Sequence, residues 1–133
     1  MQIEQFDTGL KIKKNIEDVE ITPIQNLNNK KFVIKNFRNI YGLKKINLKK
    51  NLLNIFDEDI KVNCFEPLNE FNGIDNFIEK FWNPLFDAFP DIERRENIIL
   101  GGSFRDKVQV GSYSTLSGFF LKPWLGIKPN FKM

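Results

Sequence analysis

The sequence IDNFIEKFWNPLFDAFPDIERRENIIL, residues 74–100, contains a helical pattern followed directly by a strand pattern. Its first half places large apolar side chains at helical spacing over about four turns, namely Ile74, Phe77, Ile78, Phe81, Trp82, Leu85 and Phe89. Pro84 lies inside this pattern and is expected to kink or divide the helix, because proline has no amide donor. After Phe89 the pattern changes, and residues 92–100 predict a long strand that ends at Gly101-Gly102.

Residues 107–121 continue from this turn as the partner strand of a hairpin. One face of this strand carries Val108, Val110, Ser112, Ser114 and Leu116, and the other carries Gln109, Gly111, Tyr113, Thr115 and Ser117. Because both faces mix apolar and polar side chains, a period of two does not decide which face is inward. The small and hydroxyl-bearing side chains predict that the hairpin lines a cavity.

The part of the chain before residue 74 is expected to contain helices and one strand. Apolar residues at helical spacing predict one helix over residues 30–41 and a second over residues 46–56, or one helix broken at Gly42. Residues 60–65 alternate apolar and polar side chains, which predicts a half-buried strand. Helices, a short strand, a long helix and a long hairpin indicate an α+β fold.

Residues 1–28 show no sustained period and predict an extended N-terminal arm, which leaves residues 29–133 as the domain. A chain of 133 residues can form one hydrophobic core, and 41% of its residues are hydrophobic. No apolar run is long enough to cross a bilayer, and the N-terminus has no pattern of an export signal. A soluble single domain without a membrane partner is therefore expected.

The residue types limit the chemistry that the chain can support. It contains no histidine, which removes the commonest general base and the usual zinc ligand. The single cysteine, Cys64, has no partner for an internal disulfide, so we expect a buried, inert thiol and a cytoplasmic protein. No residues have the spacing of a metal site or of a phosphate loop, so neither a metal nor another cofactor is expected.

The formal net charge is +3, and the basic excess lies in residues 1–56, which carry 11 Lys/Arg and 5 Asp/Glu, whereas residues 57–133 carry 9 and 12. Such an asymmetry is compatible with a nucleic-acid-binding surface or with a solvated helix face. We expect the solvated face and no nucleic-acid partner, because the lysines are spread through helical pattern and the predicted strands lack interleaved aromatic and basic residues.

Residues 81–95, FWNPLFDAFPDIERR, resemble the helix-to-strand junction of SnoaL-like polyketide cyclases, a group of the nuclear transport factor 2-like superfamily. The segment Ala88-Phe89-Pro90-Asp91 is its most specific part. Further similarities are Phe65-Glu66-Pro67, Phe71-Asn72-Gly73, Gly118-Phe119-Phe120 and the segment 123–129, PWLGIKP. The resemblance covers about residues 30–133, and it implies a cone in which N-terminal helices pack on a curved antiparallel sheet around an apolar pocket.

The same resemblance implies chemistry as well as a fold. In this family the ring-closing reaction is an intramolecular aldol, which needs a carboxylate in an apolar cavity. That carboxylate belongs to a later strand of the family, so the chain looks like a domain that lacks its last strands. Within this sequence the candidates are Glu66, Asp75 and Asp91. For Asp75 the alternative is a structural role at a helix N-terminus, and for Asp91 it is a role in fixing a turn, which leaves Glu66 as the catalytic candidate.

The expected ligand pocket draws on the predicted helix, the hairpin and the C-terminal segment. Its members are Phe65, Phe77, Trp82, Gln109, Tyr113, Thr115 and Trp124. For Phe77 and Trp82 the alternative is plain core packing. Arg94 and Arg95 could bind an anionic substrate or lie exposed, and on an alternating strand at most one of them faces inward.

These residues leave two functions open. The first is binding of a small hydrophobic ligand, with a cyclase or isomerase reaction that uses carboxylate acid/base chemistry. The second is a non-catalytic module of the same fold that binds a ligand or forms a homodimer through its sheet. Whether the chain is an enzyme is left open by the sequence.

Overall fold

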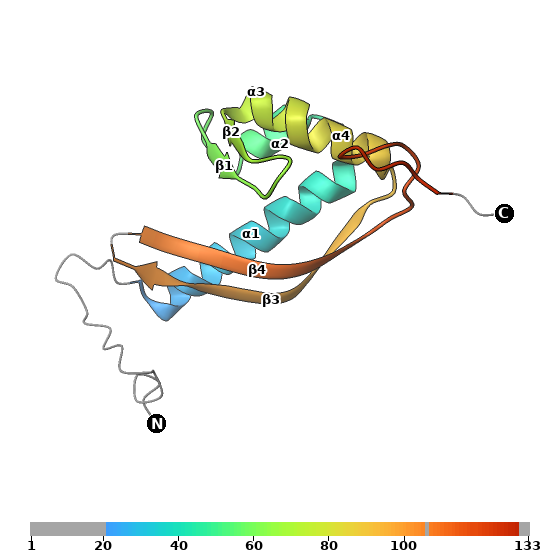
Figure 1. Ribbon diagram of the computed structural model, residues 1–133. Helices are drawn as coiled ribbons and strands as arrows, with labels where there is room; N and C mark the ends of the chain where they lie inside the picture. The colour runs from blue at the N-terminus through green and yellow to red at the C-terminus, as the bar shows by residue number, and fades with distance from the viewer. Residues whose placement is uncertain (1–20, 106, 131–133) are drawn as a thin grey trace, which may run out of the picture.

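The computed structural model describes residues 21–105 and 107–130, apart from the side chain of Phe104. The chain has a mixed α+β fold, as the sequence predicts. Its elements are α1 (Pro23–Leu43), α2 (Leu48–Leu53), β1 (Lys61–Asn63), β2 (Glu70–Asn72), α3 (Ile74–Phe77), η2 (Ile78–Trp82), α4 (Asn83–Ala88), β3 (Glu93–Phe104) and β4 (Lys107–Ser117). Figure 1 shows α1 lying along the long β3–β4 hairpin, with α3, α4 and the β1–β2 hairpin above α1 in this view.

Helix α1 begins at a capping box. The Thr22 hydroxyl accepts a hydrogen bond from the Gln25 amide at 3.1 Å, and the Gln25 side chain accepts one from the Thr22 amide at 2.9 Å. Pro23 follows the cap, where its missing amide costs no helical hydrogen bond. The expected extended arm therefore does not reach residue 28, while residues 1–20 of that arm lie outside the described part of the chain.

The helical stretch from residue 74 to residue 88 has three parts, because a π-helical turn, η2, separates α3 from α4. Pro84 lies in the first turn of α4. It cannot donate the amide hydrogen bond that an unbroken α-helix would need at this position, and a wider turn before it absorbs the missing bond. Division at Pro84 was one of the two expected outcomes.

An aromatic core joins this helical stretch to the C-terminal half of α1. Trp82 is 2% exposed, and its ring lies 5.5 Å from the ring of Tyr41 on α1 and 5.5 Å from that of Phe77. The buried core cluster is completed by Ile40, Leu48, Leu52, Phe71, Ile74, Leu85, Phe86 and Ile92. Burial of each large side chain contributes roughly 1.5–3 kcal/mol, so this cluster is the main source of stability.

The described strands form two separate antiparallel pairs. In the short pair, Val62 of β1 lies opposite Phe71 of β2. In the long pair, β3 pairs with β4 from Glu93 opposite Ser117 to Phe104 opposite Lys107 at the turn. The register shifts once, between Glu96 and Ile98. Asn97 is thus an extra residue in β3, which is the definition of a β-bulge.

Contact with α1 defines the inner face of the long hairpin. A Cβ atom added to Gly101 would collide with the Asn26 side chain of α1 and lie 3.2 Å from Cγ of Lys30. Pairing and alternation then assign further residues to this face. They are Arg94, Glu96 and Ile99 on β3, and Val110, Ser112, Ser114 and Leu116 on β4.

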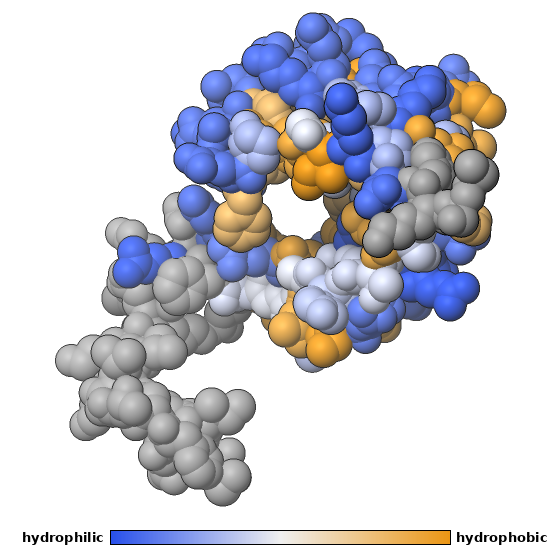
Figure 2. All heavy atoms as spheres, turned by 45° about the vertical axis from the view of Figure 1, so that its right-hand side comes forward, coloured by the Kyte–Doolittle hydropathy of each residue, from blue (hydrophilic) through white to orange (hydrophobic). Residues whose placement is uncertain are grey.

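An opening separates the α3–α4 stretch from the long β3–β4 hairpin (Figure 2). Figure 2 shows an opening between the upper part, which contains α3, α4 and the β1–β2 hairpin, and the lower part, which contains the β3–β4 hairpin. The C-terminal segment returns to α4, where Phe120 stacks on Phe89 at 5.0 Å and the Leu121 amide donates to the Ala88 carbonyl at 2.8 Å.

No helix among residues 21–105 and 107–130 is both long enough and apolar enough to cross a membrane.

Candidate functional site

Two charged side chains of β3 lie inside the fold. The side chain of Glu96 is 6% exposed and that of Arg94 is 13% exposed, while Glu93 and Arg95 lie on the surface. Alternation along the strand explains this separation, because residues two apart share a face. At most one of the two arginines was expected to face inward, and it is Arg94.

Arg94 is held by polar and aromatic contacts. Its Nη2 donates a hydrogen bond to the Ser112 hydroxyl of β4 at 2.8 Å. Its guanidinium carbon lies 4.5 Å from the ring centroid of Phe37 and 5.8 Å from that of Tyr41, both on α1. Contacts of a guanidinium with ring faces are attractive and become stronger as water is excluded. The positive charge is thereby fixed between the sheet and α1.

Glu96 has cations nearby but no hydrogen bond in the described chain. Its Oε1 lies 3.4 Å from Nε of Arg94, and its Oε2 lies 3.7 Å from Nε of Arg38, whose side chain is 68% exposed. Both carboxylate oxygens and Nε of Arg94 are buried without a hydrogen-bond partner. Leaving a buried charged group without hydrogen bonds costs more than about 1–3 kcal/mol. A hydrogen bond from a ligand donor to the Glu96 carboxylate would therefore be favourable.

The aromatic side of this site adds one titratable group and one unused donor. Burial raises the pKa of the Tyr41 phenol, and the nearby positive charge of Arg94 opposes that increase. Nε1 of Trp82, whose ring packs edge-to-face on Tyr41, is also buried without a hydrogen-bond partner. The site therefore combines ring faces with polar atoms whose hydrogen-bonding capacity is not used by the protein.

Such an arrangement can perform two tasks. Ring faces bind apolar groups, and a few placed polar atoms orient a ligand among them. A carboxylate in apolar surroundings can also accept a proton, and a fixed guanidinium can stabilise negative charge that develops beside it. We call Arg94, Glu96, Ser112, Tyr41 and Phe37 the inner polar site.

Three of the seven expected pocket residues contact the core. Phe77 and Trp82 are 6% and 2% exposed and lie in the core cluster, which was the alternative considered for both. Trp124 is half-buried, with its ring 5.8 Å from that of Phe89. Its Nε1 is buried without a hydrogen-bond partner.

The other four expected pocket residues lie on the surface and are not brought together with them. Phe65 is 93% exposed and Tyr113 is 69% exposed. Gln109 and Thr115 share the outward face of β4 with Tyr113, and the Thr115 hydroxyl accepts a hydrogen bond from the Asn97 amide at 2.7 Å. The choice of face for β4 was therefore wrong by one residue, because α1 covers the opposite side.

The expected carboxylates lie away from the inner polar site. Glu66 is exposed in the connection between β1 and β2. Asp91 accepts a hydrogen bond from the Phe119 amide at 2.8 Å, which ties the start of β3 to the segment after β4. Asp75 is 80% exposed and lies 3.0 Å from Nζ of Lys49. Asp75 and Asp91 thus have contacts that explain them structurally.

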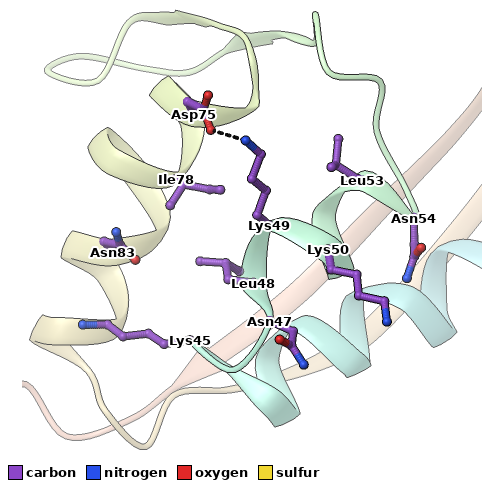
Figure 3. Close-up of a pocket in the computed structure, with 10 residues that line it drawn as sticks. All are labelled: Lys45, Asn47, Leu48, Lys49, Lys50, Leu53, Asn54, Asp75, Ile78 and Asn83. Atoms are coloured by element: carbon purple, nitrogen blue, oxygen red, sulfur yellow. Dashed lines mark ion pairs between the residues drawn. The ribbon is translucent and has the colours of Figure 1, made fainter.

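Asp75 and Lys49 line a surface pocket between α2 and the α3–α4 stretch (Figure 3). Its other lining residues are Lys45, Asn47, Leu48, Lys50, Leu53, Asn54, Ile78 and Asn83. The hydrogen bond and the negative charge of Asp75 raise the pKa of Lys49. Asp75 offsets one of the three lysine charges that line this pocket, Lys45, Lys49 and Lys50. The pair of Asp75 and Lys49 lies in an exposed setting, where ion pairs contribute little.

Sequence reasoning missed Glu96, Tyr41, Phe37 and Ser112. A usable signal was present, since Arg94 and Glu96 are two residues apart on a predicted strand and must share a face. Across residues 21–105 and 107–130, no group of three or more potential metal-binding side chains comes together.

Comparisons with known proteins identify no relative: no family model, no curated protein and no solved structure matches the chain.

Proposed function

We propose that the chain is a SnoaL-like domain of the nuclear transport factor 2-like cone type, and that it binds a small hydrophobic ligand in the cytosol. Two features support this proposal. The resembling segment, residues 81–95, contains the end of η2, all of α4 and the start of β3, so a helix-to-strand junction lies within it. Helices also precede a curved antiparallel hairpin, beside which the molecule is hollowed (Figure 2).

One observation carries the proposal, namely the buried Glu96 carboxylate, whose two oxygens lie near arginines but accept no hydrogen bond in the described chain. A ligand that fills this gap must supply a hydrogen-bond donor, such as a hydroxyl or an enol, on an otherwise apolar frame. The half-buried ring of Phe37 would contact the apolar part of the ligand. The guanidinium of Arg94, whose central carbon lies 4.5 Å from the centroid of that ring, would interact with a ligand oxygen that carries negative charge.

The enzymatic form of this proposal assigns the proton transfer to Glu96 in place of Glu66. Glu66 is exposed, whereas Glu96 is 6% exposed next to a fixed cation. In an isomerase or cyclase reaction on a carbonyl compound, Glu96 would take the proton from carbon and Arg94 would stabilise the enolate oxygen.

Binding can be tested with a pair of fluorescent aromatic ketones, one with a free hydroxyl and one with that hydroxyl methylated. We expect the hydroxyl compound to bind more tightly. Glu96→Gln should weaken its binding by about tenfold or more, because a hydrogen bond to a charged group contributes about 1.5–3 kcal/mol. Glu93→Gln, the same change on the outer face of β3, should leave binding unchanged. Equal loss in the two variants, or equal binding of the two ketones, would refute the role of Glu96.

Catalysis is tested separately by exchange of hydrogen for deuterium on the carbon next to the ketone, followed by NMR. An enzyme that uses Glu96 should accelerate this exchange, and Glu96→Gln should remove the acceleration. Binding without accelerated exchange would support the non-catalytic alternative.

A second candidate function is that of a dimerisation module, and one observation favours it. Within the described chain β4 pairs only with β3, so its other edge carries free backbone donors and acceptors. A homodimer through the sheet would satisfy them.

A further inference from the structure

Strand β4, whose edge away from β3 is free in the described chain, carries fewer charged side chains than β3. Residues 108–117 of β4 carry no charged side chain and no proline, while β3 begins with Glu93, Arg94, Arg95 and Glu96. Native proteins guard exposed edges with charged residues, proline or bulges, because an unguarded edge pairs with other chains. Apart from Lys107 at its first position, β4 has no such guard, so a second strand would meet no charge along it.

We propose that β4 pairs antiparallel with β4 of a second copy of this chain, about a twofold axis at Ser112. This inference rests on the proposed dimerisation and gives it a register. Ser112 is the middle residue of β4, Lys107–Ser117, so this axis pairs the strand along its full length. The two hairpins would then form one continuous four-stranded sheet with both α1 helices on the same side.

The strand is complementary to itself in this register. On the inner face, Val108 of each copy lies opposite Leu116 of the other; the two side chains are 46% and 48% exposed in the single chain. Cross-strand apolar pairs of this kind stabilise a sheet. The charges stay apart, since Lys107 faces Ser117.

The outer face gives a second match. Tyr113, which is 69% exposed, lies opposite Gly111 of the other copy. The space beside Gly111 is open, because a Cβ atom added to this glycine would have no atom within 4 Å. An aromatic ring across from a glycine covers the backbone that the glycine leaves bare, which is a known stabilising arrangement at sheet edges. The pairing thus covers part of the ring of Tyr113, the one aromatic side chain of β4.

The two nearest competing registers have their axes at Gly111 and at Tyr113. An axis at Gly111 places Leu116 opposite residue 106, outside β4, so Leu116 also loses its apolar partner. The axis at Tyr113 has a similar defect. It shortens the pairing at both ends and places Val108 opposite Gly118, which lies outside β4. Because a shorter ladder has fewer backbone hydrogen bonds and leaves Val108 without an apolar partner, the axis at Ser112 is favoured.

The experiment has two steps, of which the first is sedimentation of the full chain on the order of tens of micromolar, where exposed edges associate. We expect a dimer. In the second step, Ser112→Cys, Tyr113→Cys and Ser114→Cys are each made in a Cys64→Ala background and oxidised. Only Ser112→Cys should give a covalent dimer, because opposite residues of an antiparallel pair have Cα atoms about 4.5–5.5 Å apart, within disulfide range.

Each outcome has one meaning. A monomeric parent refutes the dimerisation and this register, and it leaves the ligand-binding proposal standing. A dimer that crosslinks through Tyr113→Cys or Ser114→Cys keeps the dimerisation and refutes the register. A dimer that crosslinks at none of the three positions refutes the axis at Ser112.

Charge substitution gives an independent reading that needs no crosslink. Tyr113→Lys adds a charge to the edge and removes the ring over Gly111, so it should convert the dimer to a monomer. Ile98→Lys is the matched control, because Ile98 lies opposite Tyr113 on β3, shares its face and is 56% exposed. It should leave the dimer intact. Dissociation by both variants, or by neither, would refute pairing through β4.

Discussion

At the scale of single residues, Tyr41 connects the apolar core to the buried charges. Its ring packs on Trp82, and the guanidinium carbon of Arg94 lies 5.8 Å from its centroid. Burial disfavours the charged phenolate and so raises the pKa of Tyr41, although Arg94 works in the opposite direction. The neutral phenol is therefore the form that the fold stabilises.

The protein is expected to lose stability at alkaline pH partly through Tyr41. In the unfolded chain the phenol loses its proton near about pH 10, and in the folded chain only at a higher pH. This contribution is fully present below the unfolded-state pKa and is lost as the pH rises through the folded-state pKa. Urea unfolding of Tyr41→Phe between about pH 8 and 11 should therefore show a shallower loss than the parent.

Tyr113→Phe provides the control, because Tyr113 is the only other tyrosine and is 69% exposed. Its alkaline loss should be as steep as that of the parent. If Tyr41→Phe and the parent lose stability with the same slope, the effect belongs to other groups.

The sequence predicts which residues of β3 and β4 share a face, because side chains alternate along a strand, but it predicts no more about their positions. Alternation separates Arg94 from Arg95 and divides β4 into two faces, but it does not say which face is covered. The cover comes from α1, through the contact of Gly101 with Asn26, which are far apart in the sequence. The inner polar site was missed for this reason.

At the scale of secondary-structure elements, α2 shows how one short helix contributes to the core. Its neighbouring residues Leu52 and Leu53 are 0% and 43% exposed. Leu52 belongs to the core cluster, whereas Leu53 lines the surface pocket of Figure 3. Helical geometry rotates adjacent side chains by about 100°, so the two leucines point in different directions.

Truncation of these two leucines should separate their contributions. Leu52→Ala is expected to lower the free energy of unfolding by about 2–5 kcal/mol, because it removes buried methyl groups and leaves a cavity. Leu53→Ala, the same chemical change one position later, should cost less than about 1 kcal/mol. Chemical denaturation measures both values, and similar losses in the two variants would show that α2 is not oriented as described.

Elements were more predictable than residue positions. The change from helical to alternating pattern near residue 90 located the end of α4 and the start of β3, because the two periods differ over long stretches. The start of α1 was placed too late, since Asn26, Asn28 and Asn29 have low helix propensity. Thr22 and Gln25 had the spacing of a capping box, and that signal was not used.

At the scale of the whole molecule, buried apolar surface is distributed unevenly. The core lies among α1, α2, β2 and the α3–α4 stretch, whereas Leu100 near the far end of the hairpin is 68% exposed. Local stability follows the density of buried contacts, so the two regions should open with different free energies.

Native-state hydrogen exchange should reveal this difference. The amides around Trp82 and Leu85 are expected to exchange most slowly, through global unfolding. In the Tyr113→Lys variant, which is expected to be monomeric, paired amides near the hairpin turn, such as those of Gly102 and Gln109, should exchange faster through local opening. Uniform protection across both regions of this variant would contradict the uneven distribution of buried contacts.

The bulge at Asn97 also has an evolutionary consequence. Because Glu96 pairs with Ser114 and Ile98 with Tyr113, a chain without Asn97 could keep both pairings and every side chain on its present face. Position 97 thus tolerates the loss of one residue. At another position in β3 the same deletion would move the side chains on one side of it to the opposite face of the strand. When homologous sequences are aligned with this one, a one-residue gap in this strand belongs at Asn97, and a gap placed elsewhere would exchange pocket-lining and surface columns.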